Sequence, residues 1–182
     1  MPIADRDEHP IHTIGHSTRT MPEFVDLLHL GAVDMVVDIR TVPRSRTNPQ
    51  YNLDTLPDAL AERQIGHVYL AELGGLRGKS KTVAPEVNGF WTNQSFHNYA
   101  DYALSEAFHA GLAKLLDLNR DRRCAIMCSE AVWWRCHRRI VADYLLNGGT
   151  PVFHLMAPAR IEPARLTEAA VPEGDRLVYP AA

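Results

Sequence analysis

The chain has 182 residues, 46% of them hydrophobic and 23% charged, a composition that is typical of globular proteins and excludes disordered and fibrous classes. A chain of this length is expected to fold as one domain around a single core. The formal net charge of −3 argues against a protein whose whole surface binds nucleic acid, although it permits a local basic patch.

Export and membrane insertion are not indicated. The N-terminus MPIADRDEHP carries acids and lacks the apolar core of a signal peptide, and no window approaches the roughly 18 apolar residues of a membrane span. Three cysteines, an odd number, lie too close together in the chain for a secreted disulfide framework. We therefore expect a cytoplasmic protein with reduced thiols and no membrane partner.

The first half of the chain predicts strands and helices in alternation. Residues 11–15 form a short apolar run, and the capping box Thr20-Met-Pro-Glu23 precedes a helical pattern in FVDLLHL. The run MVVDI at 35–39 is typical of a buried parallel strand. An irregular, arginine-rich loop, RTVPRSRTNPQ, follows it, and then a helix over 53–63 and a strand over 66–70 are predicted.

The second half begins with a Gly-rich segment, residues 72–93, whose length is typical of a functional lid or a disordered loop. One helix is predicted over 95–118, with Gly111 as a bend or junction, followed by a strand over 123–128, a helix over 135–146 and a strand over 151–155. The Pro/Ala-rich tail, 157–182, is predicted to cover a surface or fray.

These elements predict an α/β fold. We expect a single domain over residues 1–182, with a core over 11–156, built in three layers from a mostly parallel sheet with helices on both faces. Ligands of such folds bind at the carboxyl ends of the strands. Three polar clusters fall at predicted strand ends: His16-Ser17, Asp38 with Arg40, and Cys128 with Glu130. They are expected to open on one edge of the sheet.

Cys128 is the first candidate nucleophile because it ends a buried strand before a turn that leads into a helix, where main-chain N–H groups lower a thiol pKa. A small buried hydrophobic residue is the alternative. Glu130 is either a proton shuttle, a partner for an arginine, or a helix cap. His137 is a candidate general base or a surface histidine. Cys136, His137 and Arg138 are predicted to lie about 100° apart on one helix, so at most two of them belong to a site.

The arginines Arg40, Arg44 and Arg46 predict a clamp for an anion, a phosphate or a nucleic-acid backbone. A salt bridge between Asp38 and Arg40 inside the fold is the simpler interpretation of the first of them. Trp133 and Trp134 are interpreted as core or partner-facing residues rather than base-stacking platforms. No CxxC pair or HExxH helix is present, so no metal site is expected, and a catalytic iron or zinc is a less favoured alternative.

The motifs together resemble the uncharacterised family known as domain of unknown function 488. The stretches that carry the resemblance are TIGHSTRT, VVDIRTVPRSR, LGGLRG, FHNYADYA and MCSEAVWWRCHRR with VADYLLNGG, which span almost the whole chain. The family has no established general activity. The resemblance implies that the following residues occupy motif positions: His16, Ser17, Asp38, Arg40, Pro43, Arg44, Arg46, Cys128, Glu130, Cys136, His137 and Arg138.

The order of an Asp-x-Arg strand followed by a cysteine loop and a helix at a later strand end is also similar, more weakly, to rhodanese-like and cysteine-phosphatase domains. Those families close an anion loop with an arginine five or six residues after the cysteine, whereas Arg135 follows Cys128 by seven. The leading hypothesis is a cysteine-dependent transferase or hydrolase in which Cys128, Glu130 and His137 act on a small anionic substrate. A nucleic-acid-binding or DNA-repair-associated protein is the alternative. The sequence does not identify a cofactor or an oligomeric state.

Overall fold

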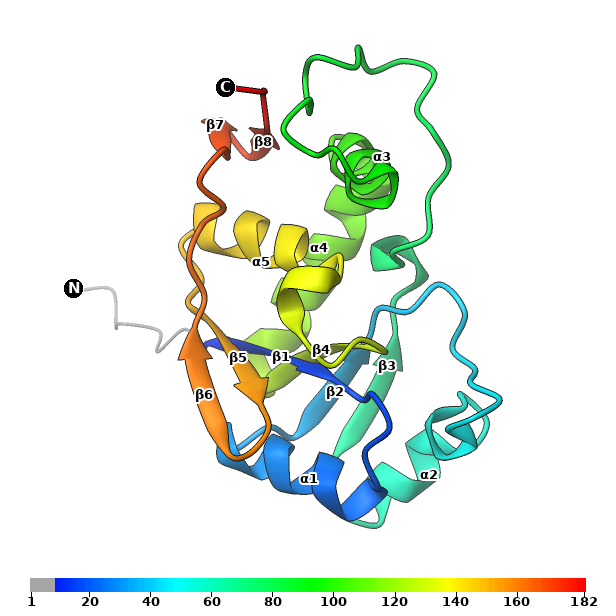
Figure 1. Ribbon diagram of the computed structural model, residues 1–182. Coiled ribbons are helices and arrows are strands. Elements are labelled where there is room, and N and C mark those ends of the chain that lie inside the picture. Colours follow the sequence, from blue (N-terminus) through cyan, green and yellow to red (C-terminus); the bar gives the residue numbers. More distant parts are fainter. Residues whose placement is uncertain (1–8) are drawn as a thin grey trace, which may run out of the picture.

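The computed structural model describes residues 9–182, and residues 1–8, where no signal peptide was predicted, lie outside the described part. Its main sheet has six strands in the order β3-β2-β4-β1-β5-β6 (Figure 1). The first five are parallel and β6 runs antiparallel to β5. The strands are β1 Ile11–Gly15, β2 Met35–Asp38, β3 Gly66–Tyr69, β4 Cys124–Cys128, β5 Val152–Met156 and β6 Arg160–Pro163. A mostly parallel sheet is thus confirmed.

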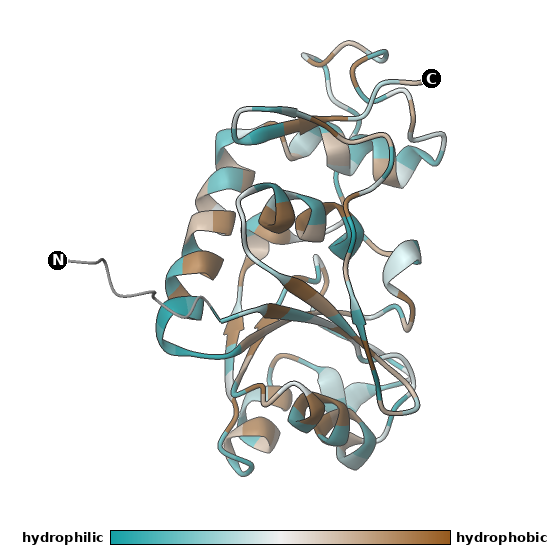
Figure 2. Ribbon diagram, turned by 90° about the vertical axis from the view of Figure 1, so that its left-hand side faces the viewer, coloured by the Kyte–Doolittle hydropathy of each residue, from teal (hydrophilic) through white to brown (hydrophobic). Residues whose placement is uncertain are grey.

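Helices cover both faces of the sheet, as predicted. They are α1 Met21–Leu30, α2 Leu56–Ala61, α3 Gln94–Tyr102, α4 Glu106–Asp121 and α5 Arg138–Asn147. Figure 1 shows α1 and α2 below the sheet and α4 and α5 above it, with α3 beyond α4. In Figure 2 the ribbon is brown, for apolar residues, along parts of these helices and of the strands between them. No helix among residues 9–182 is both long and apolar enough to cross a membrane.

Successive side chains of the central strands point to opposite faces of the sheet, and this explains why there are two cores. Val36 and Ala125 pack with α1 and α2, whereas Val37 and Ile126 pack with the helices on the other face. Parallel strands that are covered on both sides therefore read as continuous apolar runs, because successive side chains enter opposite cores. The capping box before α1 is present, with the Thr20 side chain accepting from the main-chain N–H of Glu23.

Two predicted helices differ from the structure in more than a few end residues. The segment 95–118 forms two helices rather than one, because the Ser105 side chain caps a new helix by accepting from the N–H of Phe108. Gly111 lies inside α4 and makes no junction; a Cβ there would meet Glu72 and Leu73, so its contribution is close packing. The last helix begins at Arg138, after a 3₁₀ turn over Trp133–Arg135, and Cys136 is extended.

The tail is ordered rather than frayed. It contributes β6 and the small antiparallel sheet of β7 Val171–Glu173 and β8 Arg176–Val178. Leu177 and Tyr179 are buried against the rest of the molecule. The tail was predicted to cover a surface, and it does so with specific hydrogen bonds: the main-chain N–H of Tyr179 donates to Asn88 Oδ1, and its hydroxyl donates to Asp143.

Candidate functional site at the carboxyl edge of the sheet

A cavity of about 760 Å³ lies where β1, β2 and β4 end. The loops that follow these strands form its walls, together with Gly75-Leu76 and Ser95-Phe96. Seven predicted site residues line it: His16, Ser17, Arg40, Arg44, Cys128, Glu130 and His137. Asp38, Arg46 and Arg138 do not line it. The three polar clusters therefore meet at one edge, as the parallel topology requires.

Asp38 and Arg40 form a buried, two-pronged salt bridge, so the simpler interpretation of this pair holds. Arg40 Nε donates to Asp38 Oδ1 at 2.8 Å and Nη2 donates to Oδ2 at 2.6 Å. His67 Nε2 lies 3.3 Å from the same carboxylate. The hydrogen bonds from these two partners hold the pKa of Asp38 below its usual value although burial opposes them. The carboxylate therefore stays ionised and fixes Arg40 at the cavity wall.

His16 contacts Arg40 at Nη1, the guanidinium nitrogen that Asp38 does not bind. Its Nδ1 lies 2.9 Å from the carbonyl oxygen of Ser17, which can only accept, so Nδ1 carries the proton. Its Nε2 then accepts from Arg40 Nη1 at 3.4 Å. The ring stacks on Tyr51 with a centroid separation of 4.3 Å. Burial lowers the pKa of His16, and Arg40 lowers it further, so this histidine is neutral.

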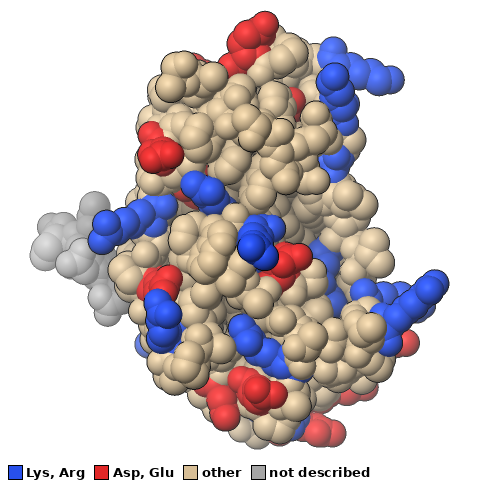
Figure 3. Space-filling model, viewed as in Figure 1, with Lys and Arg blue, Asp and Glu red and all other residues tan. Residues whose placement is uncertain are grey.

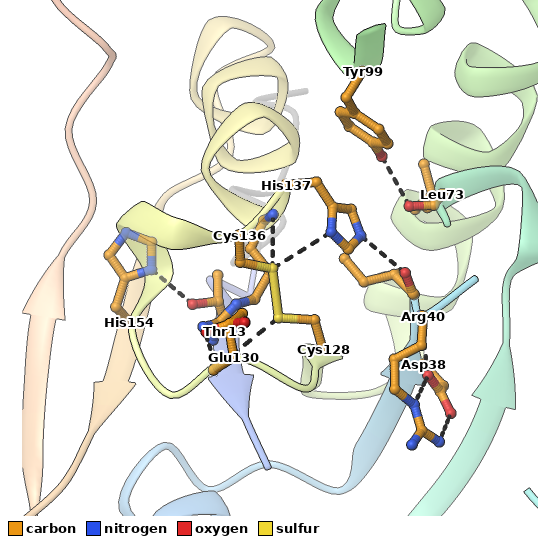
Figure 4. The surroundings of a disulfide bond; sticks show 12 residues. Thr13, Asp38, Arg40, Leu73, Tyr99, Cys128, Glu130, Cys136, His137 and His154 are labelled. Atoms are coloured by element: carbon orange, nitrogen blue, oxygen red, sulfur yellow. Dashed lines mark hydrogen bonds and ion pairs between the residues drawn. A yellow bond between two sulfur atoms is a disulfide. The ribbon is translucent and has the colours of Figure 1, made fainter. Parts of the chain in front are cut away.

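Cys128 and Cys136 are joined by a disulfide at the cavity wall, whereas the sequence predicted reduced thiols. Figure 4 shows the bond between Glu130 on one side and His137 on the other. Cys136 lies in extended conformation just before α5, and its sulfur meets that of Cys128 at the end of β4. Cys124, the third cysteine, is buried, and burial raises its pKa to about 12.

His137 lies between the disulfide and the end of β2. Its Nε2 is 2.9 Å from the carbonyl oxygen of Ile39 and its Nδ1 is 3.4 Å from Cys136 Sγ. Because the carbonyl can only accept, Nε2 carries the proton and the Nδ1 lone pair faces the sulfur. Burial lowers the pKa of His137 to about 4, with Arg138 contributing. Cys136 and His137 thus both reach the cavity.

Arg138 lies fully buried beneath the loop after β4 rather than in the cavity. Its Nη2 donates to the main-chain carbonyl of Glu130 at 2.8 Å, while Nε and Nη1 have no hydrogen-bond acceptor among residues 9–182. Burial lowers the pKa of Arg138 to about 9. Glu130 itself is exposed, and its carbonyl rather than its carboxylate organises the loop.

The remaining positive charge at the cavity comes from Arg44 and Arg135, both exposed, and the exposed Glu130 adds a negative charge. Arg135 and Cys136 were not among the predicted site residues. For Cys136 the available signal was its place in the Cys-His-Arg motif, and Arg135 comes directly before that motif. Figure 3 shows Lys and Arg scattered over one face of the molecule and interspersed with acids, without one continuous basic surface. Within residues 9–182, no three His, Cys, Asp or Glu side chains converge to hold a metal ion.

Comparison with known proteins gives one family. The family model described as Domain of unknown function DUF488 matches residues 20–145. No curated protein and no solved structure matches the chain. The matched range includes the ends of β2 and β4, the start of α5 and every cavity residue named above except His16 and Ser17.

Proposed function

The chain belongs to the family Domain of unknown function DUF488, and from that premise we propose that it is an enzyme that acts on a small anionic substrate by cysteine chemistry. The observation that carries the proposal is the convergence of Cys128, Cys136 and two exposed arginines on one cavity. Arginine binds carboxylate, phosphate or sulfate through its forked donors. A thiolate at the same wall can attack the bound molecule.

The roles follow from the geometry. Arg44 and Arg135 supply free positive charge, because Arg40 already forms an ion pair with Asp38. Cys128 is one of the two reacting sulfurs, and the Glu130 carbonyl, held by Arg138, shapes the loop beside it. In a cytoplasm, the location that we propose, the two cysteines are kept reduced and their disulfide is a transient catalytic state. The scattered charge in Figure 3 does not favour the nucleic-acid alternative.

Alkylation by reagents of different charge tests the proposal. The reduced Cys128→Ser and Cys136→Ser variants each retain one cavity thiol, and each is treated with iodoacetate and with iodoacetamide. For each variant we compare the alkylation rate with iodoacetate to the rate with iodoacetamide. We expect this ratio to be about fivefold higher for the cavity thiol than for free cysteine, because two opposite charges about 4 Å apart in water attract by about 1 kcal/mol. Arg44→Ala or Arg135→Ala should remove most of this preference, and it should weaken with added salt.

Arg165→Ala is the matched control, because Arg165 is also an exposed arginine but does not line the cavity. That variant should keep the preference for iodoacetate. Equal rate ratios for the cavity thiols and for free cysteine would contradict anion binding at this site. Alkylation no faster than that of free cysteine with either reagent would contradict an activated thiol.

A further inference from the structure

The two sulfurs of the disulfide have unequal surroundings. Cys128 Sγ faces the carbonyl oxygen of Glu130 at 4.0 Å, and a carbonyl dipole disfavours negative charge on sulfur. Cys136 Sγ instead accepts the main-chain N–H of Arg138 at 3.4 Å, at the first residue of the ten-residue helix α5. A helix N-terminus and its N–H groups stabilise a thiolate and lower the thiol pKa. Negative charge is therefore better accommodated at Cys136.

Cys136 also has a base in contact. The unprotonated Nδ1 of His137 lies 3.4 Å from its sulfur, with the ring held by Ile39 on the far side. In the reduced protein this geometry lets the Cys136 S–H donate to Nδ1. Once the proton moves, the negative sulfur beside the ring favours the imidazolium, because an opposite charge raises the pKa of a neighbouring histidine. Cys136 and His137 thus form a nucleophile–base pair.

We propose that Cys136, with His137 as its base, attacks a small disulfide that carries carboxylate or phosphate groups, and that Cys128 resolves the product. This inference rests on the proposed function and names its substrate class and its nucleophile. It is supported by the second cysteine within bonding reach and by a cavity large enough, at about 760 Å³, for an organic disulfide rather than only an inorganic anion.

The reaction has two exchanges. The Cys136 thiolate attacks one sulfur of the substrate R–S–S–R, forms Cys136–S–S–R and releases the first thiolate, which takes up the proton held by His137. Cys128 then loses its proton to solvent, and its thiolate attacks Cys136 Sγ. This forms the Cys128–Cys136 disulfide and releases the second substrate thiolate, which takes up a proton from solvent. The substrate gains two electrons and becomes two thiols, and the protein dithiol loses two.

Oxidised glutathione serves as the probe, because it is a small disulfide that carries several carboxylates. The same two reduced variants, each with one cavity thiol besides the buried Cys124, are mixed with it, and the mixed disulfide is followed by intact-protein mass spectrometry. At a pH below the pKa of both thiols, Cys128→Ser, which retains Cys136, should form the adduct about tenfold faster than Cys136→Ser. This is the net effect of a thiol pKa lowered by about two units once the accompanying loss of nucleophilicity is counted. The wild-type protein should end as the internal disulfide and accumulate no adduct.

The pH profile tests the role of His137. In the Cys128→Ser background, His137→Gln should move the midpoint of the pH–rate profile of adduct formation to higher pH, which a merely structural residue would not do. The cationic disulfide cystamine should react more slowly than oxidised glutathione, once each rate is normalised to that with free cysteine. Circular dichroism confirms that each variant is folded before its rates are compared.

Three results would overturn the inference: faster adduct formation at Cys128, a persistent mixed disulfide in the wild type, or no discrimination between the two disulfides. If iodoacetate is still preferred by the cavity thiols while any of these holds, only this inference fails. If the preference for iodoacetate is absent as well, the proposed function itself fails.

Discussion

His154 is a buried histidine that the cavity chemistry does not use. Its Nδ1 lies 2.7 Å from Thr13 Oγ1, and its ring stacks on Trp133 at a centroid distance of 4.5 Å and an interplanar angle of 5°. Burial lowers the pKa of His154 to about 3, and Arg138 contributes to the shift. Trp133 therefore belongs to the fold, as predicted, whereas Trp134 is exposed.

The lowered pKa of His154 predicts a loss of stability in mild acid. Below about pH 6.5 the unfolded chain binds a proton at this histidine while the folded chain does not, so the free energy of unfolding falls as the pH drops from 7 toward 4. His137 adds to the same slope. His154→Asn, which keeps a polar partner for Thr13, should flatten the slope measured by urea denaturation at several pH values.

His29→Asn is the control for that experiment, because His29 is exposed at the end of α1. It should leave the pH dependence as in the wild type. A His154→Asn variant whose stability falls as steeply with acid as that of the wild type would show that His154 is protonated in the folded state.

At the scale of elements, the end of β1 fits closely against the loop after β4. The main-chain N–H groups of His16 and Ser17 donate to the carbonyls of Cys128 and Ser129, each at 2.9 Å. A Cβ on Gly15 would collide with the main-chain carbonyl of Glu130. Only glycine lets the two segments approach this closely, and this approach brings the His16 and Cys128 sides of the cavity together.

Gly15→Ala should therefore destabilise the protein by about 1–3 kcal/mol, the usual effect of adding a methyl group to a packed site, because main chain rather than a flexible side chain must move. The measurement is equilibrium urea denaturation. Gly78→Ala is the matched control, since a Cβ there would meet nothing within 4 Å, and it should change the stability by less than about 0.5 kcal/mol. Equal effects of the two substitutions would contradict the close fit.

Much of the sheet could be predicted because each central strand is a short apolar run with polar residues at its carboxyl end. The start of α5 could not be predicted from periodicity. The disulfide to Cys128 and the hydrogen bond from His137 to the distant Ile39 involve residues 136–137 just before the helix. Tertiary contacts of this kind override helical propensity.

The side-chain directions in the arginine-rich loop after β2 could not be predicted from the sequence either. The sequence grouped Arg40, Arg44 and Arg46, but only the first two line the cavity. The path of this loop depends on contacts with a later segment: Ser45 N–H donates to Asn52 Oδ1, and Leu53 N–H donates to the carbonyl of Pro43. An irregular loop has no period from which the direction of its side chains could be inferred.

At the scale of the whole molecule, the C-terminal tail joins α5 to the long segment before α3. Besides its bond to Asn88, Tyr179 accepts the N–H of Phe90 through its carbonyl, at 2.9 Å. Its hydroxyl donates to Asp143 Oδ2 at 2.8 Å, in a site where burial raises the pKa of Asp143. The tail thus supports the segment whose beginning, Gly75-Leu76, lines the cavity.

Tyr179→Phe should lower the free energy of unfolding by about 1–3 kcal/mol, because a buried carboxyl group loses one of its donors. Thermal and urea denaturation at pH 7 measure the change. Tyr69→Phe removes a hydroxyl that donates to Thr41 at an exposed site, so its effect should be smaller, about 0.5 kcal/mol or less. A Tyr179→Phe variant as stable as the wild type would mean that the tail docks through apolar contacts alone.

The Asp38–Arg40 ion pair also affects the entropy of binding. Arg40 donates to Asp38, to the carbonyl of Tyr51 and to His16, so contacts within the protein already fix its side chain at the cavity wall. Freezing a mobile arginine on association opposes binding by about 0.5–1.5 kcal/mol. Binding an anion to Arg44 or Arg135 loses this side-chain freedom. Arg40 can donate its remaining Nη1 hydrogen to an anion without losing such freedom. An anion that reaches this fixed donor gains directional selectivity with little loss of side-chain freedom.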